Sequence, residues 1–567
     1  MAIQETGSGK SPTQKSWIMP GKKDSGAGSA GRAGSSPVGS GDNGGKGGSG
    51  GNHGNGGNHG NGGKGGNGGN GDIPISKTKW IGFFLGVAIF IVMMLVPSPE
   101  GLSAEGWRTA AVALLMASWW ITEVIPISAT AMIPLVLFPV LGIAPISLTA
   151  VPYANPMIFL FMGGFIIAIA MQEWGLHRRI ALNIIRVIGS RPRNILAGFM
   201  VSAMFMSMWV SNTAATMMML PIALSVIQLT KSDRNTAEET KQYHYFGVAL
   251  MLAIAFSASV GGLATVIGTP TNALLIGFVN EAYGIEISFA QWMLVGIPIA
   301  VLGFPIIYYT LAHIVYPVRF NTLPGGREYI EREVRELGSM SRPEAIVAIV
   351  FTMVAILWMT RPLIEKHLFT GISDAGIAIF GAILLFLIPV NIQKGTFMLS
   401  WKAAERLPWG VLILFGGGLT LAGAIQRTGL AEWIGGYFGI LSGWPVILII
   451  LIVAFVIIMF TELASNSATA AAFLPIMGSV AIGIGENPLL LAVPVAIVAS
   501  CAFMLPVATP PNAIVYGSNV MTIPEMARAG LVLNVFFAIL ITLLTYYLFT
   551  FILGIDIGVV PDFILSQ

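Results

Sequence analysis

Long apolar segments recur between residues 80 and 553, and they restrict this chain to few folds. Each is about 20 residues long, the length that an α-helix needs to cross the hydrocarbon core of a bilayer. Of the 567 residues, 54% are hydrophobic and only 10% are charged, whereas soluble domains carry about 25% charged residues. We therefore expect an all-α polytopic membrane protein in which about eleven helices cross the bilayer.

Residues 1–72 have a different composition from the rest of the chain. Glycine, asparagine and serine dominate, and an Asn-His-Gly-Asn-Gly-Gly pattern surrounds His53 and His59. Such a segment cannot bury a hydrophobic core, so we expect a disordered N-terminal tail followed by one membrane transporter domain over residues 73–567. No apolar stretch typical of a secretory signal peptide lies near Met1.

Charge, cysteine and histidine content exclude several classes of function. The net charge of +3 is too small to indicate a nucleic-acid partner. The single cysteine, Cys501, excludes an intramolecular disulfide framework and a cysteine-based zinc site. The histidines form no cluster at membrane depth, since only His313 lies within an apolar span. We therefore expect neither an enzyme nor a resident cofactor.

Two apolar segments, residues 195–229 and 445–484, are each interrupted by a small polar triplet. Non-helical backbone is tolerated at membrane depth only where it is buried in protein or lines a wet cavity. We therefore expect each triplet at the tip of a re-entrant hairpin made of two short half-helices. The triplets are Ser211-Asn212-Thr213 and Ser465-Asn466-Ser467.

Two further spans contain a Thr-Pro pair, at Thr269-Pro270 and at Thr509-Pro510. Proline removes a backbone donor and disfavours helix in the residue before it, so both spans should unwind at these pairs. Unwound helices expose N-termini, which attract anions. They also expose carbonyl groups that can hold sodium, and the hydroxyl and amide side chains add further donors and acceptors.

The two halves of the chain resemble each other. Asn212 and Asn466 are 254 residues apart, and Gly163 and Gly416 are 253 residues apart. A third pair, in the same order, is Ile267–Ala273 with Val507–Ala513. Lys and Arg concentrate in residues 174–194, 317–343 and 391–408, and basic loops remain in the cytoplasm.

This charge distribution places the N-terminus inside the cell and the C-terminus outside. We expect an integral protein of the plasma membrane. The first interrupted segment then enters from the inside and the second from the outside. We therefore expect inverted repeats at about 127–316 and 373–553.

No Lys or Arg lies close in sequence to any of the four motifs. An anion bound there would be held by helix dipoles and neutral donors, with co-bound sodium ions supplying the positive charge. Binding of the anion would then depend on sodium. The alternative, that small residues merely let helices pack closely, does not explain why the whole set is duplicated. Two acidic residues stand out in apolar runs: Glu123, expected at the cytoplasmic interface, and Glu462, a candidate to orient the hairpin, relay protons or ligate an ion.

At these residues, over about 75–555, the chain resembles the divalent anion/sodium symporter family of dicarboxylate, citrate and sulfate carriers. Two Ser-Asn-Thr signatures on opposed re-entrant hairpins mark that family, and the stretch Ser500–Val515 is similar to its other signature. One departure is that the second triplet ends in Ser467, so that a methyl group is lost while the hydroxyl remains.

The resemblance implies a site for each ligand. A first sodium site would comprise Ser207, Ser211, Asn212 and Gly268. A second would comprise Thr461, Ala464, Asn466 and Ala508, largely through backbone carbonyls. The substrate would contact Ser211, Asn212, Thr213, Thr269, Pro270, Ser465, Asn466, Ser467, Thr509 and Pro510.

The family also implies a homodimer in which a fixed scaffold domain supports a transport domain that slides as an elevator. Family members that exchange carboxylates without sodium carry a basic residue at a sodium position, whereas Ser207 and Thr461 are neutral here. We therefore expect sodium-coupled symport of small di- or tricarboxylates. The alternatives are a sodium-coupled carrier of sulfate or another inorganic oxyanion, a sodium-independent carboxylate exchanger and a proton-coupled carrier.

Overall fold

The computed structural model describes residues 77–230, 236–323, 325–368 and 370–561, which lie within the compact unit Ile73–Gln567. Nearly all regular structure in these ranges is helical, and the single β pairing found there is a two-stranded one. The expected all-α class is thereby confirmed. The tail expected at residues 1–72 lies outside the described residues.

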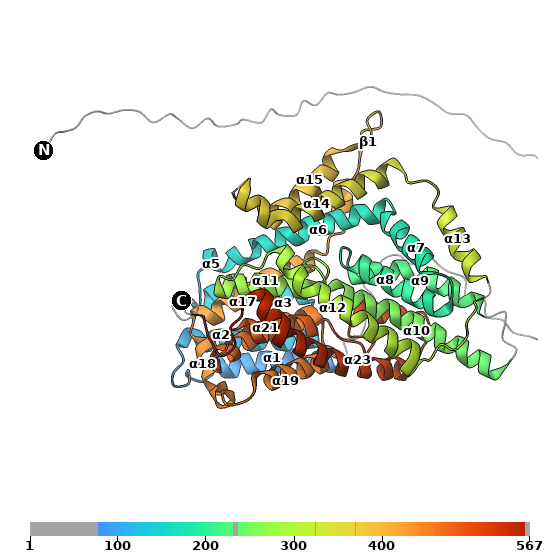
Figure 1. Ribbon diagram of the computed structural model, residues 1–567. Helices are drawn as coiled ribbons and strands as arrows, with labels where there is room; N and C mark the ends of the chain where they lie inside the picture. Colours follow the sequence, from blue (N-terminus) through green and yellow to red (C-terminus); the bar gives the residue numbers. More distant parts are fainter. Residues whose placement is uncertain (1–76, 231–235, 324, 369, 562–567) are drawn as a thin grey trace, which may run out of the picture. The chain divides into compact units, whose positions relative to one another are not determined.

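The helices follow one another in two similar series (Figure 1). The chain begins with α1 (Lys77–Leu95) and α2 (Ala104–Thr122). The first series is α3 (Ile127–Thr130), α4 (Ile133–Leu141), α5 (Ile146–Ala150), η1 (Val151–Ala154), α6 (Pro156–Glu173), α7 (Leu176–Ile188), α8 (Pro192–Ser207), α9 (Asn212–Leu229), α10 (Ala237–Gly262), α11 (Pro270–Tyr283), α12 (Phe289–Tyr309) and η2 (Thr310–Val315).

Two helices, α13 (Gly326–Glu336) and α14 (Arg342–His367), connect the two series. The second series is α15 (Asp374–Leu387), β1 (Pro389–Asn391), β2 (Thr396–Phe397), α16 (Trp401–Ala404), α17 (Trp409–Arg427), α18 (Leu430–Phe438), η3 (Gly439–Leu441), α19 (Val446–Thr461), α20 (Asn466–Gly483), α21 (Leu489–Val498), α22 (Pro510–Tyr516), α23 (Ile523–Leu544), η4 (Thr545–Phe549) and α24 (Thr550–Leu553).

Local geometry repeats along with the order of the elements. The turn from α6 to α7 passes through Gly175 at φ +74°, and the turn from α17 to α18 passes through Gly429 at φ +73°. Glycine adopts this left-handed conformation without steric cost. The long helices α12 and α23 each continue into a π-helical turn, η2 and η4. The duplication read from the sequence therefore extends to backbone conformation.

Eight helices among the described residues are long and apolar enough to cross a membrane. A ninth span results if Leu430–Leu441 and Val446–Thr461, which meet at 117°, are counted as one. Shorter apolar helices, including Asp374–Leu387 and Leu489–Val498, accompany them. The protein is thus an integral membrane protein, while eleven crossings and the inverted orientation of the repeats remain predictions.

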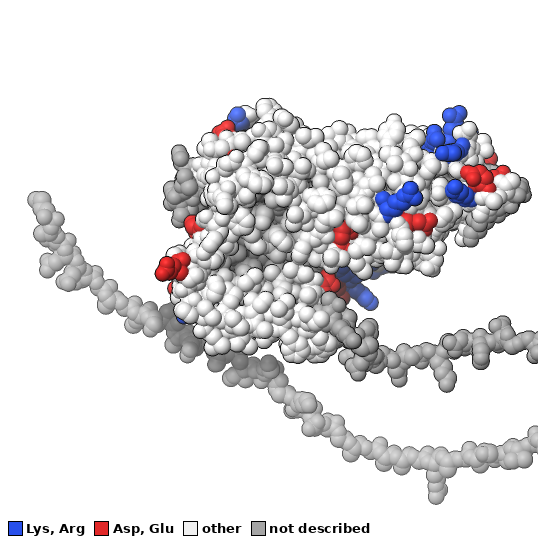
Figure 2. Space-filling model, turned by 90° about the horizontal axis from the view of Figure 1, so that it is seen from below, with Lys and Arg blue, Asp and Glu red and all other residues white. Residues whose placement is uncertain are grey.

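Burial separates inner helices from outer ones. In α10, 94% of the apolar window is buried inside the protein, whereas in α14 only 22% is buried. All ten residues of α21 are buried as well. An apolar helix with most of its surface uncovered is suited to contact with lipid, so α14 is an outer helix. Most of the surface seen in Figure 2 carries no charged side chain, and several of the Lys and Arg side chains lie at its right-hand end.

Candidate functional site

Both polar triplets lie where one helix ends and the next begins. In the first hairpin α8 ends at Ser207 and α9 begins at Asn212, and in the second α19 ends at Thr461 and α20 begins at Asn466. Ser211 is the N-cap of α9, and its hydroxyl accepts a hydrogen bond from the N–H of Ala214 (3.3 Å). The expected interruptions of both segments are therefore confirmed. We call Ser211–Thr213 the first tip and Ser465–Ser467 the second tip.

Both Thr-Pro spans are broken, as expected. Residues 263–269, the first break, separate α10 from α11, and residues 499–509, the second break, separate α21 from α22. In each case the proline is the first residue of the new helix, the position at which its missing N–H costs nothing.

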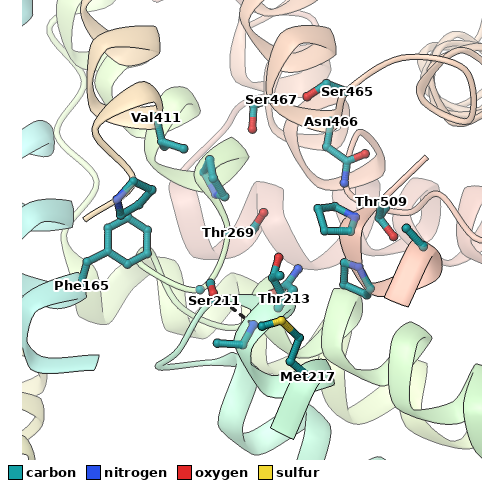
Figure 3. A pocket seen from close by; sticks show the side chains of 18 of the residues that line it. Phe165, Ser211, Thr213, Met217, Thr269, Val411, Ser465, Asn466, Ser467 and Thr509 are labelled. Atoms are coloured by element: carbon teal, nitrogen blue, oxygen red, sulfur yellow. Dashed lines mark hydrogen bonds between the residues drawn. The ribbon is translucent and has the colours of Figure 1, made fainter. Parts of the chain in front are cut away.

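Tips and breaks meet at one cavity of about 740 Å³. Figure 3 shows the two tips on opposite sides of it, with Thr269 between them. Three helices of 14 to 18 residues, α9, α11 and α20, begin at this cavity. All ten residues predicted to contact substrate line it, together with Gly268 and Ala508, whereas Ser207, Thr461 and Ala464 are buried behind it.

The rest of the lining is apolar or charged. Phe165 of α6 and Val411 of α17 line one side of the cavity (Figure 3), and Ile169 of α6 adds to this apolar wall. Glu123 and Arg406 are the charged residues among the lining residues that the structure describes. Arg406 forms an ion pair with Glu173, and both side chains are about half exposed, which places them at the mouth. Arg406 is expected from the sequence only as part of the basic loop 391–408, and its place at the cavity could not be predicted because it lies far along the chain from all four motifs.

Buried oxygen atoms gather behind the first tip. The side-chain amide of Asn212 lies 2.5 Å from the hydroxyl oxygen of Ser207, 3.2 Å from the carbonyl oxygen of Gly268 and 3.3 Å from that of Ala258. With its nitrogen toward these atoms, the amide donates to all three. With its oxygen toward them, the hydroxyl of Ser207 donates to the amide oxygen, and the carbonyl oxygens of Gly268 and Ala258 face that oxygen with no hydrogen between them, an arrangement that suits a bound cation.

A related cluster lies behind the second tip. The hydroxyl of Thr461 lies 3.0 Å from Oδ1 of Asn466 and 2.8 Å from the carbonyl oxygen of Ala499. Thr461 is fully buried, as is Ser207 in the first cluster. Hydroxyl, amide and carbonyl oxygens are the kinds of atom that bind hard cations. Ala258 and Ala499 contribute through backbone carbonyls alone, which a sequence motif does not reveal.

Two buried asparagines hold the unwound backbone. Nδ2 of Asn272 donates to the carbonyl groups of Gly262 (3.2 Å), Leu263 (3.3 Å) and Thr265 (2.8 Å). In the second break, Nδ2 of Asn512 donates to those of Ala502 and Leu505, both at 3.1 Å. Each asparagine thus replaces hydrogen bonds that the broken helix has lost.

The two repeats interlock around the cavity. Ser500 of the second break bonds to Thr271 (2.8 Å) and Thr269 (3.3 Å) through their hydroxyl groups. Helix α22 packs on α9, and α11 packs on α20, so each break is supported by the hairpin of the other repeat. Next to Ser500, the thiol of Cys501 is fully buried and lies 3.5 Å from the carbonyl oxygen of Ile497.

A family model described as the sodium:sulfate symporter transmembrane region matches residues 77–555. The chain belongs to this family. Members with high similarity are named sodium-dependent dicarboxylate transporter SdcS. The protein from Staphylococcus saprophyticus is 42% identical over 480 residues, which cover 84% of this chain and 92% of the relative. The protein from Staphylococcus aureus strain RF122 is 43% identical over 488 residues, covering 86% and 94%.

The fold of this chain also resembles those of two solved transporters, each of which is 14% identical to it in sequence. The YdaH transporter of Alcanivorax borkumensis gives a TM-score of 0.52 over 83% of this chain and 99% of that one. MtrF of Neisseria gonorrhoeae gives 0.51 over 83% and 95%. These likenesses concern the fold alone. The family resemblance seen in the motifs is thus confirmed, and the relatives named above are transporters.

Proposed function

We propose that this protein is a secondary active transporter that carries small di- or tricarboxylates, such as succinate, malate, fumarate or citrate, in symport with sodium. One observation carries the proposal: both polar tips and both breaks line a single cavity, backed by two buried oxygen clusters. The names of the relatives, sodium-dependent dicarboxylate transporters, support the same cargo.

The carboxylate groups of the substrate bind the two tips and the threonines of the two breaks. N–H groups at the starts of α9, α11 and α20 supply oriented donors at the cavity, and helix N-termini favour anions. Pro270 and Pro510 pack alongside. A volume of about 740 Å³ is ample for such small molecules. The contacts are made by the ten residues Ser211, Asn212, Thr213, Thr269, Pro270, Ser465, Asn466, Ser467, Thr509 and Pro510.

Sodium ions occupy the two buried clusters. The first site uses Ser207, Ser211, Asn212 and Gly268, and three of these residues meet at the Asn212 amide. The second site uses Thr461, Ala464, Asn466 and Ala508, of which Thr461 and Asn466 already share a hydrogen bond. Both tips thus contact an ion on one face and the substrate on the other.

This arrangement couples the two ligands. The described lining has one cation, Arg406 at the mouth, and no positive side chain between the tips. A dianion placed between the tips is therefore stabilised chiefly by sodium ions bound a few ångströms away, and the electrostatic gain is reciprocal. Each ligand raises the affinity for the other.

The transport cycle is an elevator in a homodimer. The tips and breaks form a transport domain, and the apolar wall of α6 and α17 belongs to the scaffold against which it slides. With the N-terminus inside and the C-terminus outside the plasma membrane, Arg406 and Glu123 mark the cytoplasmic mouth, so this structure is the inward-facing state. The inverted repeats at about 127–316 and 373–553 supply the two alternating arrangements.

A sulfate carrier is the second candidate, because the family description names sulfate. The test is uptake of labelled succinate, citrate and sulfate by proteoliposomes containing the full chain, with an inward gradient of sodium or of potassium. We expect succinate uptake that requires sodium. Sulfate uptake without succinate uptake would overturn the carboxylate assignment, and exchange that proceeds equally well in potassium would overturn symport.

A further inference from the structure

Glu462 directly follows the last residue of α19 and is 4% exposed. Its carboxylate accepts hydrogen bonds from three consecutive backbone N–H groups of the second break: Phe503 (2.7 Å), Met504 (2.9 and 3.0 Å) and Leu505 (3.0 Å). Nδ2 of Asn534 in α23 donates a further bond of 2.8 Å. The second hairpin is thus bound to the second break through the side chain of Glu462.

All of these partners are hydrogen-bond donors, and both carboxylate oxygens of Glu462 accept from them. No Lys, Arg or His lies within ion-pair distance of Glu462 in the part of the chain that the structure describes. A buried charge is ordinarily paired or beside a metal ion. The neighbouring residue Thr461 belongs to the second oxygen cluster, so a cation bound there would lie close to this uncompensated carboxylate.

The first repeat has no equivalent carboxylate. The residue that follows Ser207 is Met208, and it contributes only its backbone carbonyl, which accepts a hydrogen bond from the hydroxyl of Thr265. A second neutral bond, from the indole of Trp292 to the carbonyl of Leu263 (3.1 Å), holds the same break. No carboxylate at the position after Ser207 therefore binds backbone N–H groups of the first break, as Glu462 does in the second.

We propose that Glu462 is a positioning residue that pre-forms the second sodium site, and that this site consequently fills before the first. The proposal rests on the proposed function. Glu462 fixes residues 503–505, and Asn512 fixes the carbonyl groups of Ala502 and Leu505. The segment leading to Ala508 is therefore ordered before any ion arrives. Binding at the second site loses less conformational entropy and gains the attraction of the carboxylate.

The test compares Glu462→Gln with the wild-type full chain. The amide keeps the size of the side chain but removes the charge and turns a donor toward backbone N–H groups. Loss of such an outer partner of a metal site lowers metal affinity by about 10- to 100-fold. We expect the sodium concentration for half-maximal succinate uptake to rise by that factor, while the KM for succinate at saturating sodium changes little. Glu462→Asp, which keeps the charge, should restore part of the affinity.

Two further variants keep the test decisive if Glu462→Gln folds poorly. Asn534→Ala removes one bond to Glu462 without touching its charge and should shift sodium dependence in the same direction, by less. Glu105→Gln removes an exposed charge in the first turn of α2 and should change nothing. An equal rise in the KM for succinate, or unchanged sodium dependence in both Glu462→Gln and Asn534→Ala, would overturn the positioning role.

The order of filling is tested by sodium titration of purified protein without substrate, followed as a rise in Tm. We expect Ser207→Ala to keep the stabilisation seen at low sodium and Thr461→Ala to lose it. The reverse pattern would overturn the order. Should the wild type neither respond to sodium nor transport with it, the proposed function itself fails. A wild type that responds while Glu462→Gln matches it contradicts only the inference drawn from Glu462.

Discussion

The two breaks reach the same cavity by different means. Gly262 directly precedes the first break and Gly268 lies within it, and a Cβ atom on Gly268 would lie 2.4 Å from the carbonyl oxygen of Gly262. In the second break the corresponding residues are Ala502 and Ala508, so the backbone there leaves room for side chains. Besides the asparagine that serves each break, the first break has a direct approach of backbone to backbone, and the second has the side chain of Glu462 bound to its N–H groups.

This difference shows what the duplication has preserved. The place where each helix unwinds, the proline that restarts it and the asparagine that binds its carbonyl groups recur in both repeats. The carboxylate that binds backbone N–H groups of the second break, that of Glu462, has no counterpart after Ser207 in the first repeat. The pseudo-symmetry therefore lies in the prolines and asparagines of the two breaks, while the other supporting interactions differ, and substitutions at equivalent positions should have unequal effects.

The largest effect is expected at the tips, where the repeats are most alike. Asn212→Ala and Asn466→Ala each remove an amide that lies against a buried hydroxyl, and each should abolish sodium-dependent succinate uptake while the protein still elutes as a single species. Asn183→Ala, on the exposed side of α7, serves as the control. Full activity in either tip variant would remove the basis of the site.

The asparagines of the breaks come next. Asn272→Asp is isosteric but sets a carboxylate against three carbonyl groups, and leaving such buried groups unpaired costs about 1–3 kcal/mol, more when a charge is involved. Asn512→Asp faces only two. Thermal unfolding and uptake should both show the greater loss for Asn272→Asp. Equal losses would mean that the two breaks are held alike.

Adding a methyl group to the first break, at Gly268, should lower sodium affinity more than removing one from the second break, at Ala508. Gly268→Ala forces the chain away from Gly262, and overpacking of this kind costs about 1–3 kcal/mol, equivalent to about 5- to 150-fold in sodium affinity. Ala508→Gly should cost less than about 1 kcal/mol. The sodium concentration for half-maximal uptake measures the effect of each variant. A milder effect of Gly268→Ala than of Ala508→Gly would contradict the close backbone contact between Gly262 and Gly268.

The smallest effect is expected at Ser467, where the tips differ by one methyl group. Ser467→Thr makes the second tip equal to the first. Burial of one methyl group amounts to about 0.8 kcal/mol, so the ratio of the KM values for citrate and succinate should change by no more than about fourfold. A complete switch of substrate would show that this methyl group determines selectivity.

The sequence predicts the positions of the breaks because the responsible residues act locally. Pro270 and Pro510 each occupy the first position of a new helix, which suits their fixed φ and missing N–H, and Ser211 caps the helix that follows it. Repetition of the motifs also predicts that they share a site, and the cavity brings together all ten expected contact residues. Whether those residues bind substrate stays a prediction.

Interactions between distant segments could not be predicted in this way. Arg406 reaches the cavity mouth from the loop before α17, and Asn534 reaches Glu462 from α23, with no motif around either residue. Backbone carbonyls such as that of Ala258 carry no side-chain signature at all. Glu462 stood out as an acid in an apolar run, but its role depends on N–H groups about 40 residues away, which become its partners only through tertiary packing.

The buried thiol beside the second break has a practical consequence. Because Cys501 is the one cysteine of the chain and is fully enclosed, maleimide reagents should leave the resting protein unmodified. A cysteine introduced at the cavity mouth could then be labelled alone, without first engineering a thiol-free background. Any slow modification of Cys501 would then measure the rate at which the second break opens to water, without an introduced probe.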